Sequence, residues 1–356
     1  MTRLQRFKER LAADTAALIS SPQHIFYLCN FDFSDGYLLI SREKAWLLTD
    51  FRYAEAAERH ADAAFEIFCP EKGMLTAIAD LLHREGPGHL MIEEDHVTVA
   101  LRQRLEKALG AIKTESGVSA MLLGMRAVKD ERELAEIKRA QRITDAAFSH
   151  ILGFLSPSVR EIDVALELEY FMRREGADGI AFDTIAVSGS ASSLPHGVPR
   201  NCRLEKGFLT MDFGARVGGY CSDMTRTVVI GSADAEMKRL YHTVLSAQQA
   251  ALDLAAVGVR CRDMDLAARG IIDGAGYQGC FGHSLGHGVG LDVHEAPRLA
   301  RRTSELEVLL PGHVVTVEPG IYLKGKYGCR IEDMIAVNLD GTIENLTGST
   351  KDLIEI

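Results

Sequence analysis

The chain has 356 residues, of which 47% are hydrophobic, so it is long enough for two domains and can bury a substantial core. Its 40 basic and 50 acidic side chains give a net charge of −10, which argues against a nucleic-acid-binding surface. Its apolar runs are all shorter than the roughly 18 residues that a membrane-spanning helix requires, so no insertion into a membrane is expected.

The cysteines and the N-terminus indicate the cellular compartment. The chain has 7 cysteines, an odd number, and they form no CxxC pair. This usage is typical of reduced thiols in a cytoplasmic protein. Residues 1–10 are charged and lack the apolar core of a signal peptide. A cytoplasmic location is therefore expected.

Short apolar runs alternate with helical patterns in the first part of the chain. Strands are predicted at residues 36–40, 45–49 and 90–92, and helices at 50–60, 75–82 and 99–109. This order predicts a sheet covered by helices, which we assign to an N-terminal α/β domain over residues 1–122. No cluster of titratable side chains stands out in it.

A charged patch at residues 129–133 marks the predicted boundary, with a linker over residues 123–131 and a second domain over 132–356. A long helix is predicted from Glu131 to about Leu155. Ser158 to Glu161 has the capping-box pattern, and the helix that it opens is expected to end near Gly176. Its predicted inward stripe consists of Ile162, Leu166, Tyr170 and Phe171.

Two further helices are predicted at residues 233–256 and 262–274. Strand-like segments lie between and after the helices and contain most of the acidic residues discussed below. The helices should therefore form one layer and the strands another, an α+β arrangement that carries the candidate site on its sheet.

Asp212 and Asp223 lie in two strand-like runs, 208–215 and 220–230, that are separated by a short glycine-containing turn. Side chains alternate faces along a strand, so a two-residue or a four-residue loop puts both carboxylates on one face, about 5–8 Å apart. A three-residue loop would separate them. Two solvated aspartates beside a turn are the simpler alternative, but the apolar neighbours of Asp212 argue against it.

The segment 281–295 contains three histidines and four glycines, which disfavour a helix and predict a loop whose backbone approaches a ligand closely. His287, between two glycines, is the candidate metal ligand, and His283 and His294 are candidates for supporting or substrate contacts. Incidental histidines in a glycine-rich loop are the alternative.

Two glutamates complete the candidate set. Glu318 ends an apolar strand-like run, and Glu332 follows Arg330 by two residues, so those two share a strand face. Arg330 is either an ion-pair partner or a clamp for a substrate carboxylate. Four carboxylates and one imidazole suit a pair of manganese-like divalent ions better than a structural zinc. His196 and His313 are, on their own, typical of structural histidines.

In this order along the chain, the motifs resemble those of the pita-bread metallopeptidases, most closely the Xaa-Pro dipeptidases (prolidases) and Xaa-Pro aminopeptidases. The resemblance rests on residues 181–185, 194–197, 211–214, 222–226, 283–295, 318–322 and 330–333. It implies a C-terminal pita-bread (creatinase/aminopeptidase-like) domain. For the N-terminal domain it implies a smaller ribonuclease-H-like fold, and for the assembly a homodimer.

The resemblance also implies roles for individual residues. Metal ligands would be Asp212, Asp223, His287, Glu318 and Glu332. His196 and His294 would stabilise the tetrahedral intermediate and bind substrate, and His283, Tyr322 and Arg330 would shape the pocket on the proline side. His313 departs from the pattern, because an apolar residue is more usual there.

The expected activity is hydrolysis of the Xaa-Pro bond at the N-terminus of dipeptides or short peptides with proline at position two. Two divalent ions (manganese, with cobalt, zinc or iron as alternatives) would activate water, and Glu318 would carry the proton to the leaving nitrogen. The alternatives are an aminopeptidase without proline preference, for example one specific for methionine, and a non-catalytic peptide-binding relative.

Overall fold

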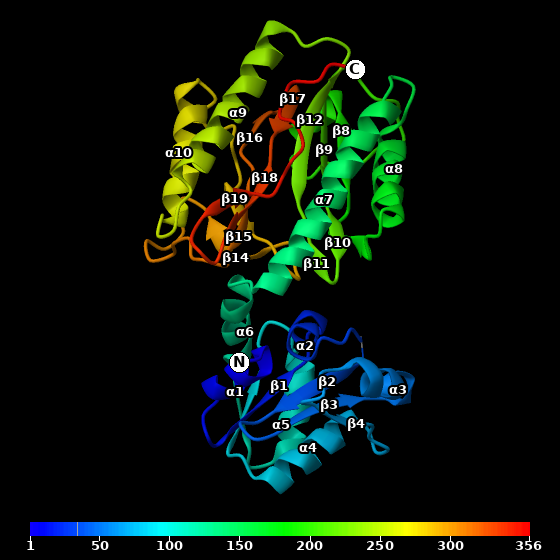
Figure 1. Ribbon diagram of the computed structural model, residues 1–356, viewed down its shortest axis with the longest axis vertical. Coiled ribbons are helices and arrows are strands. Elements are labelled where there is room, and N and C mark those ends of the chain that lie inside the picture. The colour runs from blue at the N-terminus through cyan, green and yellow to red at the C-terminus, as the bar shows by residue number, and fades with distance from the viewer. Residues whose placement is uncertain (34) are drawn as a thin grey trace. The chain divides into compact units, whose positions relative to one another are not determined.

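The computed structural model describes residues 1–33 and 35–356 and divides the chain into two compact units, Met1–Arg126 and Ala127–Ile356 (Figure 1). The division falls inside the predicted linker. Residues 123–127 of that linker belong to helix α6 (Val118–Ala127), and the next helix, α7, begins at Glu131. The domain limits 1–122 and 132–356 stay a prediction.

The N-terminal unit contains a six-stranded mixed sheet with the order β4-β3-β2-β1-β5-β6. Its strands are β1 (Thr15–Ile19), β2 (Gly36–Ile40), β3 (Ala45–Thr49), β4 (Glu66–Phe68), β5 (His89–Ile92) and β6 (Lys113–Glu115). Its helices are α1 (Arg3–Arg10), α2 (Pro22–Cys29), α3 (Phe51–His60), α4 (Met74–Glu85), α5 (Val99–Leu109) and α6. The predicted sheet with helices is confirmed, and β2, β3 and α5 have the predicted bounds.

Four long helices border the strands of the C-terminal unit, and Figure 1 shows them as two pairs with the strands between them. They are α7 (Glu131–Phe154), α8 (Glu161–Arg174), α9 (Ala235–Leu254) and α10 (Cys261–Gly274). Apolar residues of α7 and α8 form one core with strands β8, β9 and β12, and those of α9 and α10 form another with β15 and β18. Strands β9 and β12 contribute to both cores, because their residues Phe208 and Val229 pack with α9 and α10.

The strands of this unit form several small sheets, with orders β11-β10-β7, β12-β9-β8, β14-β13-β15-β18-β19 and β16-β17. Their bounds are β7 (Gly179–Ile180), β8 (Ile185–Ser188), β9 (Gly207–Phe213), β10 (Ala215–Val217), β11 (Tyr220–Cys221), β12 (Met224–Ile230), β13 (Gly286–Gly288), β14 (Glu295–Leu299), β15 (Val314–Val317), β16 (Gly320–Leu323), β17 (Tyr327–Arg330), β18 (Asp333–Val337) and β19 (Ile343–Asn345). A short 3-10 helix spans Gly189–Ser193.

Two details of α8 differ from the prediction. Arg160 is the N-cap residue, and its backbone N–H donates to the Asp163 carboxylate at 3.1 Å, so the Ser158 pattern is not the cap. The predicted inward stripe is only partly right: Phe171 is buried, but Leu166 and Tyr170 are 57% and 62% exposed. The inward face carries Val164, Ala165, Leu168 and Met172 together with Phe171. Their spacing of three and four residues gives the broader apolar stripe that packing on a sheet requires.

Helices that combine the length and the apolar character needed to cross a membrane are absent from the described part of the chain.

Candidate metal centre

The hairpin whose arms are β9–β10 and β11–β12 puts Asp212 and Asp223 on one face. Val217 lies opposite Tyr220, and the same register puts Asp212 opposite Thr225. The loop is therefore the two-residue turn Gly218–Gly219, whose φ angles of 55° and 83° favour glycine. Of the two even loop lengths that the sequence left open, the shorter one is confirmed.

His287 lies in the short strand β13 rather than in a loop, which corrects the sequence prediction. This strand pairs with β14 on one side and β15 on the other. The flanking glycines allow the neighbouring strands to approach closely. A Cβ atom on Gly286 would lie 2.0 Å from the carbonyl oxygen of Thr316, and one on Gly288 would lie 2.1 Å from that of Ala296.

The candidate ligands converge from five places: Asp212 and His287 lie in β9 and β13, and Asp223, Glu318 and Glu332 follow strands β11, β15 and β17. Donor atoms of Asp223, His287 and Glu332 all lie within 4.8 Å of one another. Glu318 joins them, because its Oε1 lies 3.2 Å from His287 Nε2. Asp212 Oδ2 accepts a hydrogen bond of 2.5 Å from Arg330. The five side chains predicted from the sequence thus surround one small region.

The charge balance of this region fits divalent cations. Burial and repulsion from the neighbouring carboxylates raise the pKa values of Asp223 and Glu332. Burial also disfavours the ionised form of Glu318, but its hydrogen bond with His287 and the nearby positive charges outweigh this effect and lower its pKa to about 2. Asp212 Oδ1 is buried without a hydrogen-bond partner among the described residues. A cation bound here would satisfy that oxygen and offset the repulsion.

Two threonines that the sequence analysis overlooked contact the candidate ligands. Thr225 donates a hydrogen bond of 2.7 Å to Glu332 and accepts one of 2.8 Å from Arg330. The Thr316 hydroxyl lies 3.2 Å from Glu318 Oε1 and accepts the backbone N–H of His287 at 3.1 Å. Each threonine is two residues from a ligand, so the alternation of strand faces could have identified both.

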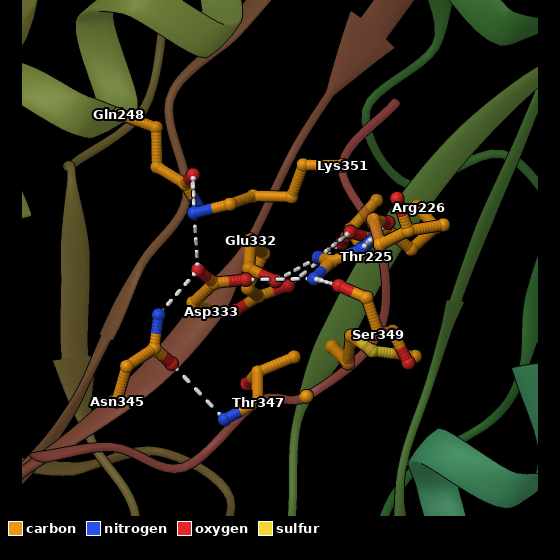
Figure 2. Close-up of polar contacts among 12 residues, drawn as sticks. Thr225, Arg226, Gln248, Glu332, Asp333, Asn345, Thr347, Ser349 and Lys351 are labelled. Carbon is orange, nitrogen blue, oxygen red and sulfur yellow. Dashed lines mark hydrogen bonds and ion pairs between the residues drawn. The ribbon is translucent and has the colours of Figure 1, made fainter. Parts of the chain in front are cut away.

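A second polar network, also overlooked, lies behind Glu332 (Figure 2). Arg226 pairs with Asp333 at 2.8 Å and also donates to the backbone carbonyl of Glu332. Lys351 donates to the other carboxylate oxygen of Asp333 at 2.7 Å and to Gln248 at 3.0 Å. Residues near the C-terminus thereby contact the strand that follows Glu332.

A cavity of about 820 Å³ opens over the ligands. His196, His283, His294 and Arg330 line it together with the candidate ligands. The rings of His287 and His294 are 4.3 Å apart. The Tyr322 hydroxyl lies 3.0 Å from His283 Nε2 and accepts a hydrogen bond of 2.7 Å from Arg330. Every predicted site residue except Tyr322 therefore lines one cavity, and Tyr322 contacts two of the lining residues, His283 and Arg330.

Burial sets the protonation of the surrounding groups. It lowers the pKa values of His283 and His294, and the charge of His287 lowers that of His294 further. Burial raises the pKa of Tyr322 to about 12, so its hydroxyl stays protonated. Near neutral pH the imidazoles of His283 and His294 are therefore neutral, and a neutral imidazole can donate a hydrogen bond to a developing oxyanion.

Comparison with known proteins supports a peptidase. Residues 135–338 match the model of metallopeptidase family M24, and residues 3–128 match the creatinase/prolidase N-terminal domain. A protein named Xaa-Pro dipeptidase from Pyrococcus horikoshii is 37% identical over 341 residues, covering 95% of this chain and 94% of the relative.

Solved structures agree along the whole chain. The structure titled Xaa-Pro dipeptidase from Bacillus anthracis has a TM-score of 0.93 and 40% identity, and the match covers 99% of this chain and 98% of that one. An X-Pro aminopeptidase from Thermotoga maritima has a TM-score of 0.90 and 37% identity, covering 98% and 99% of the two chains. The predicted two-part fold, with a creatinase-like N-terminal part and a pita-bread C-terminal part, is confirmed.

Because the family model spans the unit that holds the clustered carboxylates and histidine, the chain belongs to metallopeptidase family M24 and is a metallopeptidase.

Proposed function

We propose that the protein hydrolyses the Xaa-Pro bond at the N-terminus of dipeptides or short peptides. Two divalent metal ions would be held by Asp212, Asp223, His287, Glu318 and Glu332. The observation that carries this proposal is the convergence of Asp223, His287 and Glu332 within 4.8 Å beside the unpartnered oxygen of Asp212. The names of the relatives support the proline preference.

Bound divalent ions would supply Lewis acidity and lower the pKa of water at the site. Side chains of the protein would carry out the proton transfer and stabilise the oxyanion. Glu318 would accept a proton from the water and transfer it to the proline nitrogen, which must be protonated to leave. His196 and His294, on the cavity wall, would donate hydrogen bonds to the oxyanion.

The proline side of the substrate would lie against His283, Tyr322 and Arg330. Hydrogen bonds link these three side chains through the tyrosine hydroxyl, at 3.0 Å to His283 and 2.7 Å to Arg330. Because each side chain restricts the others, this wall has a fixed shape, which favours the rigid ring of proline. An aminopeptidase without proline preference remains the alternative.

The nature of the ligands supports manganese as the metal, since carboxylate oxygens outnumber the single imidazole; cobalt, zinc and iron are the alternatives. We further propose a cytoplasmic homodimer with domains over residues 1–122 and 132–356. Light scattering behind a sizing column would test the dimer, and limited proteolysis around residues 123–131 would test the domain limits.

The decisive experiment titrates metal-stripped protein with Mn²⁺ and follows the cleavage of Ala-Pro, Met-Pro and Met-Ala. The proposal expects two ions per chain and cleavage of the two proline peptides only. Cleavage of Met-Ala at the same rate would favour the aminopeptidase without proline preference. A series of longer Xaa-Pro peptides would then define the accepted length.

A further inference from the structure

A second cavity, of about 1060 Å³, lies beside the metal centre in the C-terminal unit. Three residues, His283, Ser284 and Arg298, line both this cavity and the one over the candidate ligands. The two spaces are therefore neighbours across a shared wall, on the side where His283 lies. His196 and His294 line the first cavity but not the second.

The second cavity is rich in arginine. Arg298, Arg301 and Arg302 line it, and all three are exposed. The acidic side chains close to them in sequence have other partners: Glu305 pairs with Arg262 at 2.6 Å, and Glu307 accepts the backbone N–H of Arg298 at 2.9 Å. Within the described residues, no carboxylate pairs with the guanidinium groups of these three arginines.

The other charged residues on the wall do not cancel this charge. Asp265 pairs with Arg269 at 2.9 Å, so these two neutralise each other. Asp273 remains as a single acidic group against three arginines. In a chain with a net charge of −10, this is a local basic surface, and it favours an anionic occupant.

The wall beside the metal centre is fixed in place. Arg269 donates hydrogen bonds to the backbone carbonyls of Phe281 at 2.7 Å and of His283 at 3.0 Å. Its guanidinium also lies 4.2 Å from the centre of the Phe281 ring. Asp265 accepts the backbone N–H of Leu285 at 3.1 Å. The Asp265–Arg269 pair thus holds the segment between the two cavities.

We propose that the second cavity binds the part of a peptide substrate that follows proline and selects peptides with a carboxylate at the third or fourth position. This rests on the proposed function, in which His283 faces the proline side. An extended peptide advances about 3.3 Å per residue, so one or two residues past proline would reach beyond His283. Arg301 and Arg302 would then bind an acidic side chain or the C-terminal carboxylate.

The test compares Ala-Pro-Glu-amide, Ala-Pro-Gln-amide and Ala-Pro-Lys-amide, in which only the third side chain differs. We expect the glutamate peptide to have a kcat/KM about tenfold above that of the glutamine peptide, mainly through a lower KM, and the lysine peptide to be the poorest. The preference should decrease with added salt. Ala-Pro-amide, which has no third residue, provides the baseline.

Replacing both arginines, Arg301→Gln with Arg302→Gln, should abolish the preference and leave cleavage of Ala-Pro-amide unchanged. Arg203→Gln, an exposed arginine outside both cavities, is the matched control and should keep the preference. Equal kcat/KM values for the glutamate and lysine peptides, or a preference that survives the double substitution, would overturn the inference.

The experiments can reject the proposed function and the proposal for the second cavity separately. If no Xaa-Pro peptide is cleaved, the proposed function is wrong. Calorimetric binding of the same three peptides to the wild-type and doubly substituted proteins still tests the cavity without turnover. Equal binding of the three peptides rejects the proposed role of the second cavity. Glutamate-selective binding that is lost in the double variant supports that role.

Discussion

The guanidinium of Arg226 and the carboxylate of Asp333 form an ion pair of 2.8 Å in which the two side chains are only 1% and 0% exposed. Arg226 lies on β12, the strand that follows Asp223, and Asp333 is the residue after Glu332. Arg226 also donates to the carbonyls of Ser349 and Thr350, at 2.8 and 2.9 Å. The pair therefore joins two strands of the candidate metal centre to the C-terminal segment.

Asp333→Asn should strongly destabilise the C-terminal unit. The amide has nearly the volume of the carboxylate but leaves the charge of Arg226 buried without compensation, which costs about 3–5 kcal/mol. Urea unfolding would measure the loss. Glu55→Gln is the control, because its partner Arg59 and Glu55 itself are 68% and 76% exposed, and this loss should stay below about 1 kcal/mol. Equal effects of the two substitutions would refute the assigned importance of the buried pair.

Lys351→Met should weaken metal binding more than it weakens the fold. Lys351 Nζ contacts Asp333 at 2.7 Å, but its side chain is 23% exposed, so water can partly replace its contacts. Loss of a group that orients a ligand indirectly typically costs about tenfold or more in metal affinity. Calorimetric Mn²⁺ titration, with thermal melts in parallel, would measure both effects. Lys238→Met, on a loosely paired exposed lysine, serves as the control, and Lys351→Arg should restore part of the affinity.

Gly286→Ala should disrupt the strand that carries His287. A Cβ atom at this position would lie 2.0 Å from a backbone oxygen of β15, which no side-chain movement can relieve. Gly282→Ala, in the same segment, places its Cβ where no atom lies within 4 Å, and is the matched control. We expect the first variant alone to lose Mn²⁺ affinity, measured by titration. Equal metal affinities in the two variants would contradict the role given to Gly286.

Sequence periodicity predicted part of this site and missed the rest for identifiable reasons. Alternation along strands put Asp212 and Asp223 on one face for either even loop length, so only the choice of loop needed the structure. His287 was predicted in a loop because the glycines of its segment disfavour a helix. Its strand exists because β14 and β15 supply pairing partners that are distant in sequence. Likewise, packing against the sheet determines which residues of α8 are buried, and the helix sequence on its own does not specify that face.

His313 should make the protein sensitive to mild acid. Burial and the nearby charge of Lys129 lower its pKa from 6.5 to about 4. The unfolded chain therefore binds a proton more readily between these values, and the stability present above pH 6.5 is lost as the pH falls toward 4. The full difference corresponds to about 3 kcal/mol.

His313→Asn keeps an acceptor for the Leu310 N–H, which is 3.2 Å from His313 Nδ1, but removes the titrating group. Its free energy of unfolding should change less with pH between 6.5 and 4.5 than that of the wild type. Urea unfolding at several pH values would measure the two slopes. Identical slopes would show that other groups cause the acid sensitivity.

Glu318→Gln should abolish turnover while the fold persists. The Glu318 side chain is near His287 and Thr316, at 3.2 Å from each, and an amide can keep its oxygen within reach of both. It cannot accept the proton of the attacking water, and loss of a general base typically costs about 10²–10⁴ in kcat. Cleavage of Ala-Pro by metal-loaded protein is the primary measurement.

Thermal melting and bound Mn²⁺ must be determined on the same sample, because Glu318 is also a proposed ligand. Loss of activity with both ions retained assigns the proton transfer to Glu318. Loss of one ion assigns the defect to metal binding, and near-wild-type turnover rules out the proposed role altogether.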